Sequence, residues 1–124
     1  MAKSVLIADD EPNIILSLKF IMEQAGYDVR VARDGDDALA QMAQHPPDLV
    51  LLDVMMPKLT GYDVCQAIRA NPDYAGTRII MVTAKGREAE REKGLALGAD
   101  DYVTKPFSTR DVLQQVRSLL EPAE

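Results

Sequence analysis

Five short strand-like segments alternate strictly with five helical patterns along this chain. The helical patterns repeat apolar residues three or four positions apart, which is typical of helices that cover a sheet. Segments in this alternating order form parallel sheets, because each helix returns the chain to the start of the next strand. The sequence therefore predicts an α/β fold with helices on both faces of one parallel sheet.

The expected strands cover residues 4–8, 28–32, 49–53, 79–83 and 101–103, and the five helices follow them in turn. Segment 49–52 is wholly apolar, as a strand covered on both faces must be, whereas segment 28–32 alternates and is expected at an edge. The last helix should begin at Ser108, whose spacing to Asp111 resembles a capping box. Right-handed crossovers favour a doubly wound sheet in the flavodoxin-like order 2-1-3-4-5. We expect a single domain over residues 1–124.

Charged residues stand where these strands should end. Asp9 and Asp10 follow the first strand, Asp53 closes the third and Lys105 follows the fifth. Because the carboxyl ends of parallel strands meet at one edge of a sheet, we expect these side chains to share a pocket. Clustered carboxylates repel one another unless a divalent cation enters, and hard oxygen ligands suit Mg²⁺. The sequence therefore predicts a magnesium site.

Each of these residues has a simpler structural interpretation. Asp9 and Asp10 could cap the first helix, since acidic residues favour helix N-termini. Lys105 could be a solvated surface lysine, and Thr83 and Tyr102 could be ordinary strand residues. Asp53, at the end of a buried strand, has no comparable structural explanation.

The amino-acid composition limits the kinds of partner that are expected for this chain. The net charge of -6 argues against direct nucleic-acid binding, because phosphate backbones are bound by clustered Lys and Arg. The apolar runs are too short to span a bilayer, and no signal peptide is recognisable. The lone cysteine, Cys65, agrees with a reducing compartment. We expect a cytoplasmic protein that binds neither nucleic acid nor a membrane.

Four motifs occur in order along the chain: Asp9-Asp10-Glu11, Asp53-Val54-Met55-Met56-Pro57 with Gly61, Val82-Thr83-Ala84, and Gly98-Ala99-Asp100-Asp101-Tyr102-Val103-Thr104-Lys105-Pro106-Phe107. Together they resemble the receiver (CheY-like) domains of two-component response regulators. The resemblance implies a phosphorelay function, in which a sensor histidine kinase or a histidine phosphotransfer protein donates a phosphoryl group. The domain would then switch its binding face for an output protein. It would not be a turnover enzyme, although it would catalyse its own phosphorylation and slow dephosphorylation.

The resemblance also implies an acceptor and a set of metal ligands. Asp53 would accept the phosphoryl group, while Asp10 and the backbone carbonyl of Met55 would hold Mg²⁺ directly. Asp9 would act on the ion mainly through water. Met55 and Lys85 occupy positions that resemble tuning positions for the attacking water. Because neither side chain accepts a strong hydrogen bond, we expect slow self-dephosphorylation.

The remaining site residues are also assigned by the resemblance. Lys105 would contact the phosphoryl oxygens and Thr83 would hydrogen-bond one of them. Tyr102 would change rotamer together with Thr83. The peptide before Pro106 would be cis, which would aim Lys105 inward.

Other functions fit only parts of the sequence. A phosphatase of the haloacid dehalogenase type would carry an Asp-x-Asp motif after the strand. Here Met55 stands in place of the second Asp of that motif. A non-phosphorylated receiver-like interaction module is defined by loss of the acidic pocket or the lysine, and this chain has both. The segment 85–107 resembles receivers of winged-helix regulators, which implies a weak, phosphorylation-enhanced homodimer. The charged residues that could cross its interface are Arg91, Asp100, Asp101, Arg110 and Asp111, while Gln115 replaces a basic residue usual in those relatives.

Overall fold

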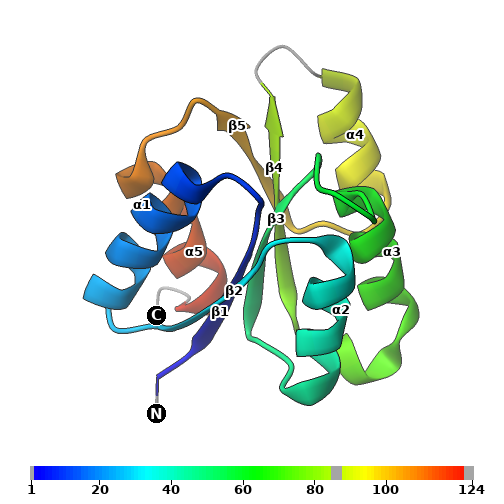
Figure 1. Ribbon diagram of the computed structural model, residues 1–124, viewed down its shortest axis with the longest axis horizontal. Coiled ribbons are helices and arrows are strands. Elements are labelled where there is room, and N and C mark those ends of the chain that lie inside the picture. Colours follow the sequence, from blue (N-terminus) through cyan, green and yellow to red (C-terminus); the bar gives the residue numbers. More distant parts are fainter. Residues whose placement is uncertain (1, 85–87, 122–124) are drawn as a thin grey trace.

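A parallel sheet of five strands lies at the centre of the computed structural model, which describes residues 2–84 and 88–121 (Figure 1). Its strands are β1 (Ser4–Ala8), β2 (Asp28–Ala32), β3 (Leu49–Asp53), β4 (Arg78–Ala84) and β5 (Asp101–Lys105). They lie in the order β2-β1-β3-β4-β5, and each neighbouring pair is parallel. The predicted flavodoxin-like order is confirmed, with β2 at one edge.

Helices cover both faces of the sheet. Helices α1 (Pro12–Gln24) and α5 (Thr109–Leu120) lie together on one face, as Figure 1 shows. Helices α2 (Gly35–Gln44), α3 (Gly61–Ala70) and α4 (Glu88–Ala96) cover the other, and a short 3₁₀ turn (Pro72–Tyr74) leads from α3 toward β4. Within the described ranges, no helix combines the length and the apolar character needed to cross a membrane.

Strand β3 contributes to two core clusters, one on each face of the sheet. All five of its residues are buried. Val50 and Leu52 belong to the cluster under α2 and α3, whereas Leu49 and Leu51 belong to the cluster under α1 and α5. Successive side chains of a strand point to opposite faces, and each buried Leu or Val stabilises the fold by about 1.5–3 kcal/mol. This two-sided packing fixes the carboxyl end of β3, where Asp53 stands.

The start of α5 corrects one sequence prediction. The helix begins directly after Ser108, as expected, but the Ser108 side chain makes no capping hydrogen bond. A capping box begins α3 instead. There the Thr60 hydroxyl accepts from the Asp63 N–H, while the Asp63 carboxylate accepts from the Thr60 N–H. The sequence spacing was compatible with capping at Ser108, but the local side-chain geometry does not use it.

Candidate functional site

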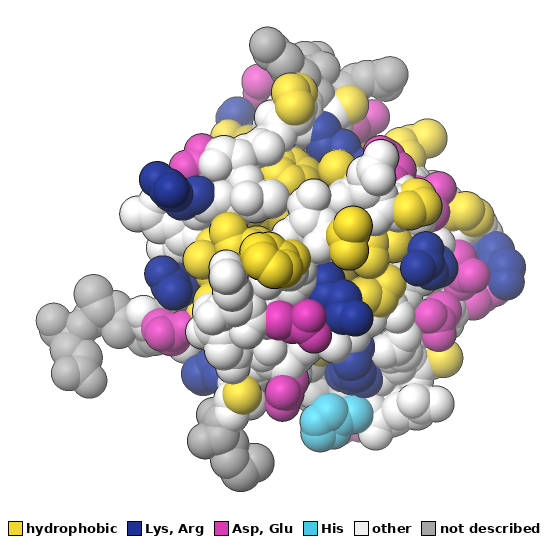
Figure 2. Space-filling model, turned by 60° about the vertical axis from the view of Figure 1, so that its left-hand side comes forward, with side chains coloured by type: hydrophobic (Ala, Val, Ile, Leu, Met, Phe, Trp, Pro, Cys, Tyr) yellow, Lys and Arg dark blue, Asp and Glu magenta, His cyan; other side chains and the backbone are white. Residues whose placement is uncertain are grey.

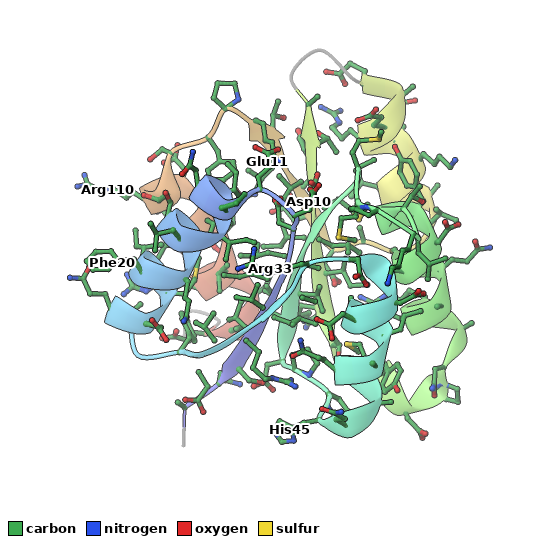
Figure 3. All side chains as sticks on the ribbon, in the orientation of Figure 1. Asp10, Glu11, Phe20, Arg33, His45 and Arg110 are labelled. Atoms are coloured by element: carbon green, nitrogen blue, oxygen red, sulfur yellow. The ribbon has the colours of Figure 1, made fainter. Side chains whose placement is uncertain are left out.

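The predicted acidic cluster forms at the carboxyl end of the sheet. Asp9 and Asp10 follow β1, and Asp53 is the last residue of the adjacent strand β3. One carboxylate oxygen from each lies within 4.8 Å of the other two. Asp9 and Asp53 are only 2% and 5% exposed, whereas Asp10 is exposed at the rim. Figure 3 shows Asp10 and Glu11 where the chain passes from β1 to α1.

Lys105 reaches this cluster from the end of β5. Its Nζ atom lies 3.5 Å from Asp53 Oδ2 and 3.6 Å from Asp9 Oδ2. It also donates a hydrogen bond of 2.8 Å to Glu11 Oε1. The sequence prediction that lysine joins the acids is confirmed, and the peptide between Lys105 and Pro106 is cis, as the resemblance implied. The pairing with Glu11 was not predicted; the only signal for it was the third acid in the run 9–11.

Helix capping does not explain the first two acids. The N-cap residue of α1 is Glu11, and no side chain caps that helix end. Asp9 Oδ1 instead accepts a hydrogen bond of 3.0 Å from the Glu11 N–H. This bond holds the Asp9 carboxylate in the turn between β1 and α1, beside Asp53.

The turn after β3 fixes the position of Asp53. The Val54 N–H donates to the Val82 carbonyl at 3.0 Å, and the Gly61 N–H donates to the Val54 carbonyl at 2.8 Å. The Met55 N–H donates to Asp53 Oδ1 at 3.3 Å. Gly61 comes so close that a Cβ atom there would lie 2.3 Å from the Asp53 carbonyl oxygen. Backbone contacts therefore hold this carboxylate in place.

Burial and repulsion give the pocket unusual acid–base properties. Burial raises the pKa of Asp53 to about 7, and the charge on Asp9 adds to the rise, while Lys105 and the Met55 N–H oppose it. The pKa of Asp9 is also raised, chiefly by burial. Burial alone would lower the pKa of Lys105, but its hydrogen bond to Glu11 and the charges of Asp53 and Asp9 raise it. A second cation would therefore be favourable in this pocket.

Thr83 and Tyr102 lie on the side of the sheet that α4 covers. Thr83 is buried in β4, one residue beyond the register partner of Asp53. The Tyr102 hydroxyl accepts a hydrogen bond of 3.0 Å from Arg91 Nη1, and the Arg91 guanidinium lies 4.7 Å from the ring centroid. Helix α4 therefore holds Tyr102 in this structure, and its rotamer change with Thr83 stays a prediction. Lys85, expected to influence dephosphorylation, lies outside the described residues.

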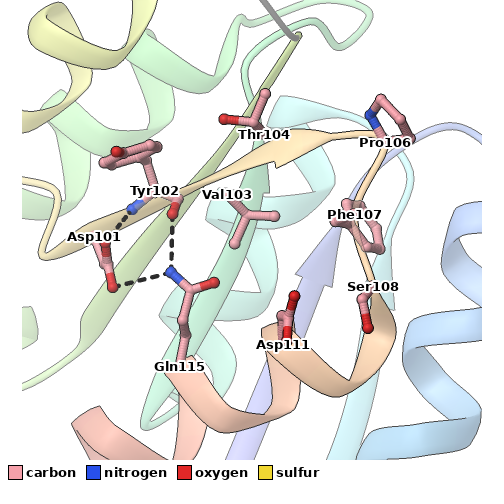
Figure 4. Close-up of a pocket in the computed structure, with 9 residues that line it drawn as sticks. All are labelled: Asp101, Tyr102, Val103, Thr104, Pro106, Phe107, Ser108, Asp111 and Gln115. Carbon is pink, nitrogen blue, oxygen red and sulfur yellow. Dashed lines mark hydrogen bonds between the residues drawn. The ribbon is translucent and has the colours of Figure 1, made fainter.

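Several residues expected at a dimer interface already have partners within the chain. Asp100 accepts hydrogen bonds from two arginines and one backbone N–H. Asp101 accepts a hydrogen bond of 3.0 Å from Gln115, beside a hollow between β5 and the start of α5 (Figure 4). Arg91 lies 3.3 Å from a carboxylate oxygen of Glu88 in addition to contacting the β5 tyrosine. Of the five candidates, Asp100, Arg110 and Asp111 are exposed.

Comparisons with known proteins agree with this arrangement. The family model described as "Response regulator receiver domain" matches residues 5–117. The alkaline phosphatase synthesis transcriptional regulatory protein PhoP of Bacillus subtilis is 45% identical over 124 residues, which are 100% of this chain and 51% of that protein. The probable transcriptional regulator ycf27 of Cyanophora paradoxa is 48% identical over 122 residues, 98% of this chain and 50% of that protein. The chain thus spans about half the length of these curated relatives.

A solved structure also resembles this chain along nearly its full length. A putative response regulator from Chloroflexus aurantiacus superposes with a TM-score of 0.93 at 33% identity. The superposition covers 97% of this chain and 98% of that one.

Proposed function

The chain belongs to the response regulator receiver domain family, and on this premise we propose that Asp53 is the residue that carries the phosphoryl group. The protein is a phosphoacceptor receiver of a two-component system, and a receiver domain implies a histidine kinase as partner. The observation that supports Asp53 is its placement. It is a buried carboxylate at the end of the central strand, beside Asp9 and 3.5 Å from Lys105 Nζ.

In the proposed reaction, a carboxylate oxygen of Asp53 attacks the phosphorus of a phosphohistidine on the kinase or on a phosphotransfer protein. The P–O bond forms as the P–N bond breaks, so the imidazole leaves with the electron pair and Asp53 carries a mixed anhydride. Phosphoryl transfer depends mainly on positioning and charge neutralisation. Lys105 would contact the transferred oxygens, and the Thr83 hydroxyl would donate a hydrogen bond to one of them. Later hydrolysis restores the carboxylate, so the chain modifies itself and is not a turnover enzyme.

The oxygen atoms of the pocket fit Mg²⁺. The carboxylates of Asp10 and Asp53 and the Met55 carbonyl would hold the ion directly, and Asp9 would act mainly through water. The fit rests on three clustered carboxylates and on the raised pKa of Asp53, which has burial and the Asp9 charge among its causes. When bound, the ion would neutralise part of the negative charge that the phosphoryl oxygens bring.

Locating the phosphoryl group tests this function. After incubation with acetyl phosphate and Mg²⁺, mass spectrometry should find one added phosphoryl group, on the peptide that contains Asp53. Asp10→Ala should suppress labelling, because it removes a proposed metal ligand. Asp28→Asn, which removes an exposed charge at the opposite end of the sheet, should label like the parent. A label on another residue would contradict the proposal.

We further propose that the phosphodonor docks on α1. Leu16 and Phe20 are large apolar side chains one helical turn apart, yet they are 70% and 64% exposed. Figure 2 shows hydrophobic side chains with Lys and Arg among them on the side of the molecule that carries α1. Lys19 and Arg33 line a hollow together with Leu16. Because α1 starts beside the acidic pocket, a donor that reaches Asp53 would also lie close to this face of the helix. Its surface would carry an apolar centre and acidic groups.

Substitution on α1 separates docking from chemistry. Phe20→Ser should slow phosphotransfer from a phosphorylated histidine kinase about tenfold relative to labelling by acetyl phosphate, because an exposed aromatic anchor is lost. Leu95→Ser, which changes an exposed apolar residue on α4, is the matched control and should leave this ratio unchanged. Equal slowing with both donors would contradict a docking role for Phe20.

Self-association through α4, β5 and α5 is proposed as weak and enhanced by phosphorylation. Arg91 and Asp101 already have partners within the chain, so an intermolecular pair would replace existing contacts. Exposed ion pairs contribute only ~0–1 kcal/mol each, and the exposed candidates are Asp100, Arg110 and Asp111. Sedimentation with and without a beryllofluoride mimic should show a dimer only at high concentration with the mimic. A monomer in both states would contradict the proposal.

A further inference from the structure

Met55 differs sharply from the other described methionines. Its side chain is 69% exposed, whereas Met22, Met42, Met56 and Met81 are each 8% exposed or less. The cause is the path of the turn after β3: Val54 and Met56, on either side of Met55, are both buried. An apolar side chain is thus held in solvent, at a position that the backbone contacts of the turn fix.

This exposed thioether belongs to the residue that contacts the acceptor carboxylate. The Met55 N–H donates to Asp53 Oδ1 at 3.3 Å. Within one residue the amide nitrogen and Cβ are only about 2.5 Å apart, so the Met55 side chain starts within roughly 6 Å of that oxygen. The exposed Met55 side chain is therefore attached beside the acceptor carboxylate.

We propose that Met55 is an oxidation site, and that its sulfoxide shortens the lifetime of the phosphoryl group on Asp53. This inference rests on the proposed function of Asp53. The oxidant is hydrogen peroxide. One peroxide oxygen forms a bond to the Met55 sulfur as the O–O bond breaks, which gives the sulfoxide and water. The sulfur loses two electrons, and the peroxide gains them.

The change in polarity explains the effect on hydrolysis. A thioether accepts hydrogen bonds weakly, whereas a sulfoxide is a polar group with a strongly accepting oxygen. A water molecule held by that oxygen is placed beside the mixed anhydride on Asp53. Its oxygen bonds to phosphorus as the bond to Asp53 breaks, and inorganic phosphate, the free carboxylate and a proton result. Oxidation therefore switches the phosphorylated state off faster.

Peptide mapping after mild hydrogen peroxide treatment tests selectivity. Met55 should gain one oxygen well before the four buried methionines do. Met1 lies outside the described residues, so its oxidation is scored separately. Oxidation of the buried methionines at the same rate as Met55 would overturn the proposal.

Decay of the phosphorylated protein tests the consequence. The parent is labelled with acetyl phosphate, freed of donor, and followed by phosphate release before and after peroxide treatment. Decay should become several-fold faster after oxidation of the parent, and methionine sulfoxide reductase should reverse the change. Met55→Leu should decay at the same rate with and without peroxide. Met55→Gln, which supplies a permanent carbonyl acceptor, should decay several-fold faster than Met55→Leu without any oxidant.

The outcomes separate this inference from the proposed function. Failure of the untreated parent to label at Asp53 would overturn the proposed function. Normal labelling with a decay rate that Met55 oxidation does not change would overturn only the inference. An equal acceleration by peroxide in Met55→Leu would assign the effect to another residue and would overturn the inference as well.

Discussion

Replacing Asp53 with Asn is expected to abolish phosphoryl labelling and, at the same time, to make the metal-free protein more stable. Labelling is lost because the amide cannot supply the attacking carboxylate oxygen. Stability rises because Asn removes a buried negative charge beside Asp9. We expect a gain of about 2 kcal/mol in the free energy of unfolding near pH 8, measured by urea denaturation in a chelating buffer.

The dependence on pH follows from the direction of the Asp53 shift. In the folded protein burial raises the pKa of this carboxyl to about 7, above its usual 3.8. Between these two values the folded state keeps a proton that the unfolded state has lost. The group's contribution to stability is therefore fully present below about pH 4 and is lost as the pH rises through about 7. The advantage of Asp53→Asn should grow over the same interval and nearly vanish at its acidic end.

A divalent cation should increase the stability of the parent relative to Asp53→Asn. Mg²⁺ that binds only the folded parent stabilises it by mass action, whereas Asp53→Asn lacks one of the proposed ligands. Added Mg²⁺ should therefore stabilise the parent more than the variant. Asp28→Asn removes a charge at an exposed position and should change the free energy of unfolding by less than about 0.5 kcal/mol. A metal-free Asp53→Asn protein less stable than the parent near pH 8 would contradict the electrostatic explanation.

The position of the site could be predicted from sequence because it depends on topology alone. Asp9 directly follows β1, and Asp53 and Lys105 are the last residues of β3 and β5. Parallel strands of one sheet place their carboxyl ends at the same edge. The wholly apolar segment before Asp53 marked a central strand, and the alternating segment 28–32 marked an edge. No side-chain conformation was needed for these conclusions.

Side-chain pairings could not be predicted in the same way. The long, flexible side chain of Lys105 can reach any of three nearby carboxylates, and in the structure it pairs most closely with Glu11. Residue spacing does not show which of the three it contacts. Asp100 was one of the charged residues that could cross a dimer interface; within the chain it joins the end of α3 to β4 through Arg69 and the Ile79 N–H, a pairing that was not predicted. Such choices depend on distances of a few tenths of an ångström, which residue spacing does not encode.

Gly61→Ala is expected to destabilise the protein by about 3 kcal/mol and to reduce labelling of Asp53, because the new methyl group meets backbone and not a movable side chain. A Cβ atom at this position would lie 2.3 Å from the Asp53 carbonyl oxygen and 2.8 Å from the Val54 Cα atom. This clash can be relieved only if the end of β3 or the start of α3 shifts. Either shift weakens the hydrogen bond from the Gly61 N–H to the Val54 carbonyl and moves the acceptor carboxylate away from Lys105.

Gly76→Ala is the matched control, since a Cβ atom there would meet nothing within 4 Å. Its backbone does not require glycine either, so this variant should be as stable as the parent or up to about 1 kcal/mol more stable. Urea denaturation gives the free energy of unfolding of both variants. The extent of labelling with acetyl phosphate shows whether the Asp53 carboxylate is still placed for reaction. If Gly61→Ala matches Gly76→Ala in both measurements, close backbone contact does not hold Asp53 in place. A loss of labelling larger than the unfolded fraction explains would show that the turn after β3 positions the carboxylate as well as stabilising the fold.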